Sequence, residues 1–238
     1  MREILVFWTA FNTWRSKDLC RDVKSPLHPV CTKEWNKKRL DFWKDHTLAS
    51  ILNQNVDRWV YIVRLDPSLR EMCEPMLPRI DDRRVIYSYE GSHEREMLIE
   101  NLNSWYDSIV TVRIDSDDMY ARGAGREILN CPDAEWMFFK IGFGYNHKSK
   151  TLYNYDTRTS GPFFAHRYVG CQRLEQIKEI QHQRVIKKRP AVLPSGQFLV
   201  NITGGNTTTT GISKHFCGVI WKKSIERQIL KKFGGTCG

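Results

Sequence analysis

Three carboxylates, Asp115, Asp117 and Asp118, stand close together near the middle of the chain. They follow the run Ile109–Ile114, whose β-branched residues predict a buried strand with Arg113 as its only interruption. Carboxylates this close repel one another unless a proton or a cation lies between them, and their oxygens suit Mg²⁺ or Mn²⁺. Open α/β sheets also bind ligands outside the carboxyl ends of their strands. The alternative interpretation is an ordinary acidic turn that caps a helix.

Length and composition are those of one folded domain. The chain has 238 residues, of which 41% are hydrophobic, and its net charge of +10 favours anionic partners such as nucleotide phosphates, nucleic acid or an acidic membrane surface. Its seven cysteines form no CxxC pair, so we expect reduced thiols in a cytoplasmic protein. The apolar run Met1–Trp8 is too short for a signal peptide or a membrane span, so the glycosylation sequons at Asn201 and Asn206 are interpreted as chance matches.

The first half of the chain predicts alternating strands and helices. Apolar runs favour strands, and apolar residues at helical spacing favour a helix from Lys37 to about Asn55 and another around Leu98, Leu102 and Trp105. The expected strands are Ile4–Phe7, Trp59–Leu65, Arg84–Ser88 and Ile109–Ile114. Residues 16–36 show no clear period and predict an excursion. Crossover connections of this kind predict an α/β fold with a mainly parallel sheet.

The second half predicts a mixture of short elements. We expect a short helix over Ala124–Leu129, and a hairpin made of Trp136–Gly144 and Thr151–Tyr155. A short extended piece (Gly161–Ala165), a basic helix (Leu174–Val185), a loop (Asn201–Thr210) and a final helix (Ile225–Phe233) complete the expectation. The final helix carries Lys222, Lys223, Arg227, Lys231 and Lys232 on its polar face, which favours either a solvated face or peripheral contact with a membrane.

This order of parts resembles the GT-A class of nucleotide-sugar glycosyltransferases. Three segments look like those of the rhamnosyltransferase-type enzymes of bacteria and some large viruses: Trp43–Gln54, Trp59–Asp66 and Val112–Asp118. The loop Thr9–Asn12 resembles the family's first-strand loop, which more often has Arg in place of Ala10. Gly204–Thr207 looks like a degraded His-Gly-x-Asn segment. The resemblance covers about residues 1 to 215, and it implies one GT-A-like domain with a nucleotide-binding half (1–120) and an acceptor-binding half (121–238).

The resemblance also implies a function and a set of site residues. The expected function is metal-dependent transfer of a hexosyl or rhamnosyl group from a UDP- or dTDP-type sugar to a glycan, a polysaccharide or a lipid-linked acceptor. Mn²⁺ or Mg²⁺ would be held by Asp117 with Asp115, and His215 is the nearest candidate for a third ligand. The family pattern assigns the nucleotide to Thr9, Phe11, Asn12, Asp66, Arg113 and Asp115.

An inverting transfer needs a general base for the acceptor hydroxyl. Asp156 is the expected base, because it ends one strand of the hairpin, and Asp118 either supports the metal or faces the donor sugar. Glu175 and Glu179 compete with Asp156, but the nearby Lys178 favours a solvated helix face there. The alternative functions are a basic metal-dependent nuclease and a nucleic-acid-binding protein. Against both, the basic residues are spread along the chain without a recognition motif, so we expect no nucleic-acid partner.

Overall fold

The computed structural model describes residues 1–11, 32–89, 91–157, 163–170, 174, 185, 187–202, 216–220 and 222–234. The elements of the first half are β1 (Glu3–Ala10), α2 (Lys33–Trp43), α3 (Ala49–Leu52), β2 (Trp59–Leu65), α4 (Arg70–Cys73), β3 (Val85–Tyr89), α5 (His93–Trp105) and β4 (Ser108–Arg113). Those of the second half are β5 (Met119–Tyr120), α6 (Ala124–Leu129), β6 (Trp136–Phe139), β7 (Ile141–Asn146), β8 (Thr151–Asp156), β9 (Phe164–Val169), β10 (Ala191–Leu193), β11 (Phe198–Ile202), β12 (Phe216–Val219) and α8 (Lys223–Lys231).

A large sheet forms the centre of the molecule, with strand order β10-β6-β9-β4-β1-β2-β3. The pairs β4–β1, β1–β2 and β2–β3 are parallel, whereas β9 runs antiparallel to both of its neighbours. This arrangement confirms the α/β fold class with a mainly parallel sheet. The chain passes from β1 to β2 and β3 on one side and then returns to place β4 on the other side of β1. The strand order therefore reverses between β1 and β4, where ligands of doubly wound folds bind.

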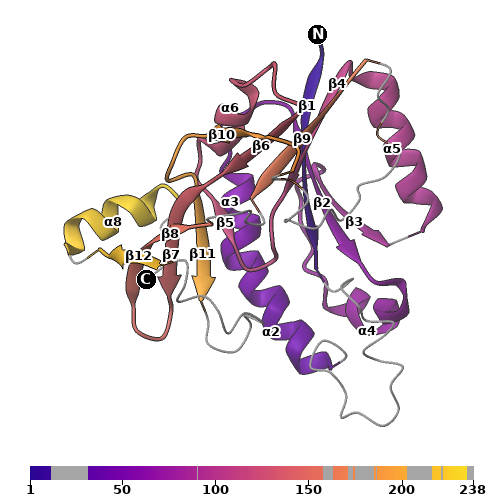
Figure 1. Cartoon of the computed structure of the whole chain (residues 1–238). Helices are drawn as coiled ribbons and strands as arrows, with labels where there is room; N and C mark the ends of the chain where they lie inside the picture. The colour runs from indigo at the N-terminus through magenta and orange to yellow at the C-terminus, as the bar shows by residue number, and fades with distance from the viewer. Residues whose placement is uncertain are drawn as a thin grey trace.

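Helices cover both faces of β1, which explains its continuous apolar sequence. Leu5 and Phe7 point toward the core that contains Trp43 of α2, while Ile4, Val6 and Trp8 point toward the core that contains Ile99 and Leu102 of α5. Figure 1 shows α5 beside the large sheet and α2 with α3 running along the other side. The expected helix α5 is confirmed, but the prediction that Trp105 lies on its apolar face is wrong, because this residue is 61% exposed at the end of the helix.

The helix before β2 begins earlier than the sequence predicts, at Lys33 rather than Lys37. The Thr32 side chain accepts a hydrogen bond from the Trp35 amide at 3.3 Å, and this cap starts α2 inside the stretch interpreted as an excursion. A π-helical turn, Lys44–Leu48, joins α2 to α3. Such turns insert one extra residue per turn and re-aim the side chains that follow.

The expected strand Trp136–Gly144 is wrong as a single element. It divides at Lys140 into β6, which belongs to the large sheet, and β7, which belongs to a small sheet of order β12-β8-β7-β11-β5. The β7–β8 hairpin is confirmed. β11 continues through Asn201 and Ile202, so these two residues are strand and not loop. A Cβ at Gly142 would lie 2.7 Å from the Phe198 ring, which stacks on Phe163, so a glycine is needed where the two sheets meet.

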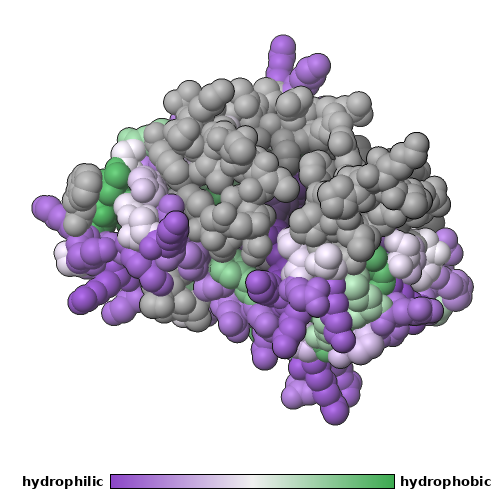
Figure 2. Space-filling view, turned by 90° about the horizontal axis from the view of Figure 1, so that it is seen from below, coloured by the Kyte–Doolittle hydropathy of each residue, from purple (hydrophilic) through white to green (hydrophobic). Residues whose placement is uncertain are grey.

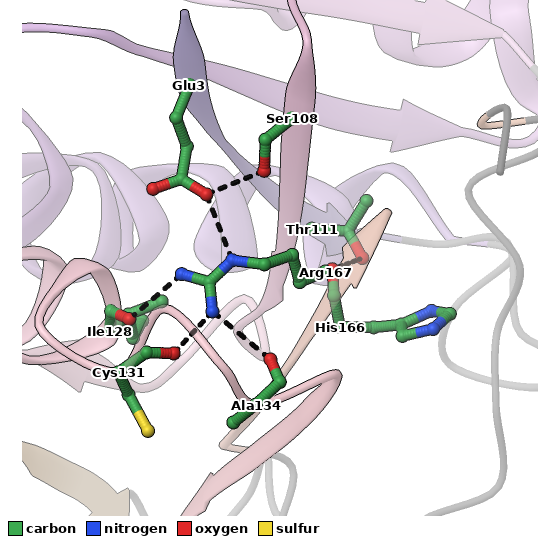
Figure 3. Close-up of polar contacts among 8 residues, drawn as sticks. All are labelled: Glu3, Ser108, Thr111, Ile128, Cys131, Ala134, His166 and Arg167. Carbon is green, nitrogen blue, oxygen red and sulfur yellow. Dashed lines mark hydrogen bonds and ion pairs between the residues drawn. The ribbon is translucent and has the colours of Figure 1, made fainter. Parts of the chain in front are cut away.

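A buried arginine fastens β9 to neighbouring elements at the amino-terminal end of β1 (Figure 3). The Arg167 Nε donates to Glu3 Oε1 at 2.9 Å, and Ser108 Oγ donates to the same oxygen at 2.6 Å. The remaining nitrogens of Arg167 donate to the carbonyl oxygens of Ile128, Cys131 and Ala134 at and beyond the end of α6. This cluster lies at the opposite end of β1 from Asp115 and has a structural role.

The final helix α8 packs beside the small sheet. Leu230 and the following Phe233 are buried against Leu152 and Leu199, while the basic residues Lys222, Lys223, Arg227, Lys231 and Lys232 are exposed. Figure 2 shows polar side chains gathered on this side of the molecule. No described helix is both long and apolar enough to cross a membrane. Contact of α8 with a membrane surface stays a prediction.

Candidate active site

The candidate site lies where the carboxyl ends of β1 and β4 meet. The Thr9 hydroxyl donates to the Ile114 carbonyl at 2.7 Å and accepts from the Tyr61 hydroxyl at 2.9 Å. Trp43 Nε1 in turn donates to the Tyr61 oxygen at 2.8 Å. This buried chain of hydrogen bonds joins α2, β2, β1 and β4, so it fixes where the chain leaves β4. Thr9 is fully buried, and its hydroxyl fixes the backbone at Ile114, directly before the first of the three carboxylates.

The acidic residues sit on a tight turn directly after β4, which we call the acidic loop (Asp115–Asp118). The Asp118 amide donates to the Asp115 carbonyl at 3.1 Å and closes this turn. Tyr120 follows, and its hydroxyl donates to the Arg113 carbonyl at 2.7 Å, which anchors the turn to the end of the strand. The turn brings the three carboxylates together.

The three carboxylates differ in exposure and in partner. The Asp115 side chain is 36% exposed and pairs through Oδ1 with Arg113 at 3.0 Å. Asp117 and Asp118 are buried. Asp117 pairs through Oδ2 with NH1 of Arg39 at 2.8 Å. Asp115 is therefore the most accessible of the three to a ligand that approaches from solvent.

Arg39 reaches the acidic loop from α2. Its Nε donates to Ser116 Oγ at 2.8 Å, in addition to the ion pair with Asp117, and its guanidinium lies 5.7 Å from the Trp35 ring centroid. Arg39 precedes Leu40 and Trp43 on the buried side of α2, and for this reason it points inward. It supplies a fixed positive charge to a cluster of three negative charges.

Asn201 supports the acidic loop from the small sheet. Its backbone amide donates to Asp118 Oδ1 at 3.3 Å, and its side-chain nitrogen donates to the Asp117 carbonyl at 2.7 Å. Its side-chain oxygen lies 2.8 Å from Nε2 of His147, which must donate in this arrangement. His147 packs against the ring of His46, which lies in the π-helical turn. The acidic loop is thus joined to the large sheet through β4, which it follows, and to the small sheet through Asn201 of β11.

Burial and mutual repulsion act on the carboxylates. Burial raises the pKa of Asp118 well above its ordinary value, and the nearby Asp117 and Asp115 raise it further. Burial also raises the pKa of Asp117, with Asp115 adding to the effect and Arg39 opposing it. A cation brought to this loop would relieve the mutual repulsion of the carboxylates.

The small sheet brings Tyr155, rather than Asp156, toward the acidic loop. Burial raises the pKa of Tyr155, and the charges of Asp118 and Asp115 add to this shift, which places its hydroxyl in their field. Neighbouring side chains on a strand point to opposite faces. Asp156, the last residue of β8, opposite Ile141, therefore points to the other face of the small sheet. Its role as the base stays a prediction.

Phe11, Asp66 and Arg113, which are also expected to bind the nucleotide, lie at the carboxyl ends of β1, β2 and β4. Phe11 is buried and contacts the Trp43 ring edge-on, with 6.3 Å between ring centroids. Asp66 follows β2, is buried, and caps a short 3-10 helix by accepting from the Ser68 amide at 2.8 Å and hydroxyl at 2.6 Å. Arg113 lies near the Trp8 ring. Asn12, His215, Glu175 and Glu179 lie outside the described residues.

The acidic loop offers oxygen ligands that suit a divalent cation, but the described residues do not surround such an ion completely. Its oxygen donors are hard, and burial disfavours their negative charges. Across the described ranges, no three His, Cys, Asp or Glu side chains are placed to hold a metal together. A Mg²⁺-type ion is commonly bound by one or two carboxylates and completed by water and substrate phosphates. That is the binding mode that this loop supports.

Sequence reasoning missed Arg39, Asn201 and His147. Arg39 had a detectable signal, because it is a charged residue next to Leu40 and at helical spacing from Trp43 on an apolar face. Asn201 ends an apolar run, Phe198–Val200, that predicts a strand better than a loop. Nothing in the sequence pairs His147 with Asn201, since the two residues meet only when β7 and β11 align.

Comparisons with known proteins give weak similarities of fold. No family model and no curated protein sequence matches the chain. S. aureus TarS 1-349, solved in complex with UDP-GlcNAc, is 11% identical with a TM-score of 0.44, over 99% of this chain and 72% of that one. Rv0371c from Mycobacterium tuberculosis H37Rv, solved in complex with manganese, is 12% identical with a TM-score of 0.37, over 85% of this chain and 90% of that one.

The inositol-1-phosphate CTP transferase from T. maritima is 13% identical, with a TM-score of 0.32 and 85% of each chain covered. In another S. aureus TarS 1-349 structure, this chain spans 60% of the length. At these values an activity does not transfer from one protein to another. The fold assignment rests on the strand order and its reversal between β1 and β4. The chain has an α/β fold with a mainly parallel central sheet, and its acidic loop lies where the strand order reverses.

Proposed function

We propose that this protein is a glycosyltransferase that moves a sugar from a nucleoside-diphosphate sugar to a hydroxyl group of a glycan or another acceptor. The observation that carries this proposal is the position of the acidic loop. Asp115, Asp117 and Asp118 lie at the carboxyl end of β4, beside β1, where the strand order reverses. Nucleotides bind at this point in doubly wound folds.

Each group of the site has a role in this proposal. Asp115 and Asp117 would hold a Mg²⁺ or Mn²⁺ ion, which neutralises the charge of the leaving diphosphate when bound. Asp115 is exposed enough to face the ribose and the metal edge. Arg113 and Asp66, at the ends of β4 and β2, would contact the nucleotide. Thr9 holds β1 and β4 in register beneath it.

The acceptor would approach over the small sheet. Tyr155 of β8 lies in the field of Asp115 and Asp118, and its aromatic ring offers a surface on which a sugar can stack. The proposed transfer inverts the anomeric centre, with Asp156 or Asp118 as the base that takes the acceptor proton. A hexosyl or rhamnosyl donor of the UDP or dTDP type remains part of this proposal.

A binding screen tests the proposal. Thermal unfolding is measured with UDP, dTDP, their sugar conjugates, and ADP as a control, each with and without Mn²⁺. A nucleoside diphosphate that stabilises the protein only with metal supports the proposal, as does slow release of free sugar from the matching donor. Cleavage of labelled DNA or RNA without any stabilisation by nucleotide sugars would replace the transferase with the nuclease alternative.

A further inference from the structure

Arg39 occupies the position at the acidic loop where a metal ion is expected. Its NH1 lies 2.8 Å from Asp117 Oδ2, and its Nε lies 2.8 Å from Ser116 Oγ. Two of the five N–H groups of the guanidinium therefore have acceptors among the described residues, and both acceptors belong to the acidic loop. The contact joins residues 78 positions apart in the sequence.

This ion pair is built into the fold. The side chains of Arg39 and Asp117 are each 10% exposed, and Leu40 and Trp43 on the same side of α2 are buried. Ion pairs on a protein surface exchange freely with water and salt, whereas a buried pair is screened much less. The Asp117 carboxylate therefore has a permanent cationic partner before any ligand arrives.

A divalent ion and Arg39 compete for the same carboxylate. A guanidinium does not lose its proton in a protein, so its charge cannot be removed to make room for the metal. Two cations separated by a few ångströms repel each other. A nucleoside diphosphate changes this balance, because its phosphate oxygens accept guanidinium hydrogen bonds in a bidentate way.

We propose that Arg39 is an internal counter-ion that excludes metal from Asp117 until a diphosphate takes over its guanidinium. Arg39 is then a positioning residue that couples the binding of metal to the binding of donor. This inference rests on the proposed function. Coupling is reciprocal, so the diphosphate strengthens metal binding by the same factor by which metal strengthens diphosphate binding.

Two substitutions separate the charge of Arg39 from its structural role. Arg39→Gln removes the charge and retains a hydrogen-bond donor for Ser116, while Arg39→Lys retains the charge as a compact ammonium group. Lys38→Met is the matched control, because Lys38 is exposed on the same helix and its substitution removes the same charge. Mn²⁺ binding is measured by electron paramagnetic resonance in the absence of nucleotide, and UDP binding by calorimetry with and without Mn²⁺.

In Arg39→Gln, Mn²⁺ alone should bind about tenfold more tightly than in the native protein, and the strengthening of Mn²⁺ binding by UDP should shrink by a similar factor, a magnitude typical of coupling between sites. Metal-free UDP should bind more weakly. Arg39→Lys and Lys38→Met should bind Mn²⁺ alone as the native protein does. A loss of structure would weaken all binding, so an increase in Mn²⁺ affinity cannot come from damage to the fold.

An Arg39→Gln variant that binds Mn²⁺ no more tightly than the native protein overturns the inference. If this variant does not fold, the effect of UDP on Mn²⁺ binding by the native protein tests the inference. Mn²⁺ binding that UDP does not strengthen overturns the inference while leaving both ligands bound, as the proposed function requires. A native protein that binds neither Mn²⁺ nor UDP removes the proposed function, and the inference with it.

Discussion

The side-chain nitrogen of Asn201 donates a hydrogen bond of 2.7 Å to the carbonyl oxygen of Asp117, 84 positions earlier in the chain. The bond links the last part of β11 in the small sheet to the turn that follows β4 in the large sheet. Because the Asn201 amide also contacts Asp118, one residue holds two of the three acidic positions. The geometry of the candidate nucleotide site thus depends on the second half of the chain.

Replacing Asn201 by Ala should therefore destabilise the protein and weaken nucleotide binding together. The substitution leaves the buried Asp117 carbonyl without its side-chain donor, which typically costs about 1–3 kcal/mol. Urea unfolding measures the loss, and calorimetry with UDP and Mn²⁺ measures the binding. Asn154→Ala is the control, because Asn154 is exposed on β8 and its loss should change stability by less than about 0.5 kcal/mol. Native stability in Asn201→Ala would contradict the bridging role.

Arg167 should matter for stability but not for binding. Arg167→Met leaves Glu3 without its buried partner and removes the donors to three carbonyl oxygens near α6 (Figure 3), a change that typically costs about 3–5 kcal/mol. UDP affinity in the variant that remains folded should equal that of the native protein. Arg2→Met serves as the control, because the Arg2–Asp107 pair is exposed and surface pairs contribute little. Altered UDP affinity in Arg167→Met would show that this cluster is coupled to the site.

Local sequence patterns are sufficient to predict the elements whose bounds are set by burial. The buried strand Trp59–Leu65 and the helix Ala124–Leu129 have the bounds that their apolar patterns predict, since burial on one or both faces governs those patterns. The division at Lys140 was not predictable, because β6 and β7 read as one apolar run although they join different sheets. The residue types in a run of aromatic and β-branched residues do not indicate which of two sheets the strand joins.

The candidate site shows the same limit. The acidic loop could be predicted, because Asp115, Asp117 and Asp118 are adjacent in sequence and follow an apolar strand. The contacts of Arg39 and Asn201 with this loop could not be predicted, because folding brings these two residues to the loop from distant segments. The nucleotide roles assigned to Thr9, Asp66 and Arg113, and the base role of Asp156, are still predictions.

The free energy of unfolding should fall in mild acid, because His46 takes up a proton when the protein unfolds. Burial lowers the pKa of His46 from 6.5 to about 4, and the neighbouring His147 adds to this effect. The unfolded chain therefore binds a proton between these values that the folded protein does not, so this contribution to stability is complete above about pH 6.5 and is lost as the pH falls toward 4. The raised pKa values of Asp117 and Asp118 act in the opposite direction.

The pH effect of His46 is isolated by comparing the native protein with His46→Gln. Urea unfolding at pH 7.5 and pH 5 should show that the native protein loses more stability on acidification than the variant does, because only the native protein has this imidazole to protonate on unfolding. The buried carboxylates are common to both proteins, and their contribution cancels in the difference. An equal loss in both proteins would mean that His46 is solvated enough to titrate normally.

The choice of base is tested by Asp156→Asn. If Asp156 takes the acceptor proton, transfer should fall about 10²- to 10⁴-fold, while UDP affinity stays at its native value because the lost interaction belongs to the transition state. Asn154→Ala, on the same face of β8, should leave transfer unchanged. Undiminished transfer in Asp156→Asn would remove this residue from the mechanism and leave Asp118 as the next candidate, to be tested by Asp118→Asn.

Metal-dependent binding of a nucleoside diphosphate at the acidic loop is the most direct test of the whole account. The free energy of unfolding is measured for the native protein and for Asp117→Asn, each with UDP, with and without Mn²⁺. At a UDP concentration about 100-fold above Kd, the native protein should gain about 2.7 kcal/mol when Mn²⁺ is present, and much less without it. The variant should lose the gain that depends on Mn²⁺, because Asp117 no longer offers a carboxylate. Equal gains in the two proteins would contradict the assignment of the acidic loop as the donor site.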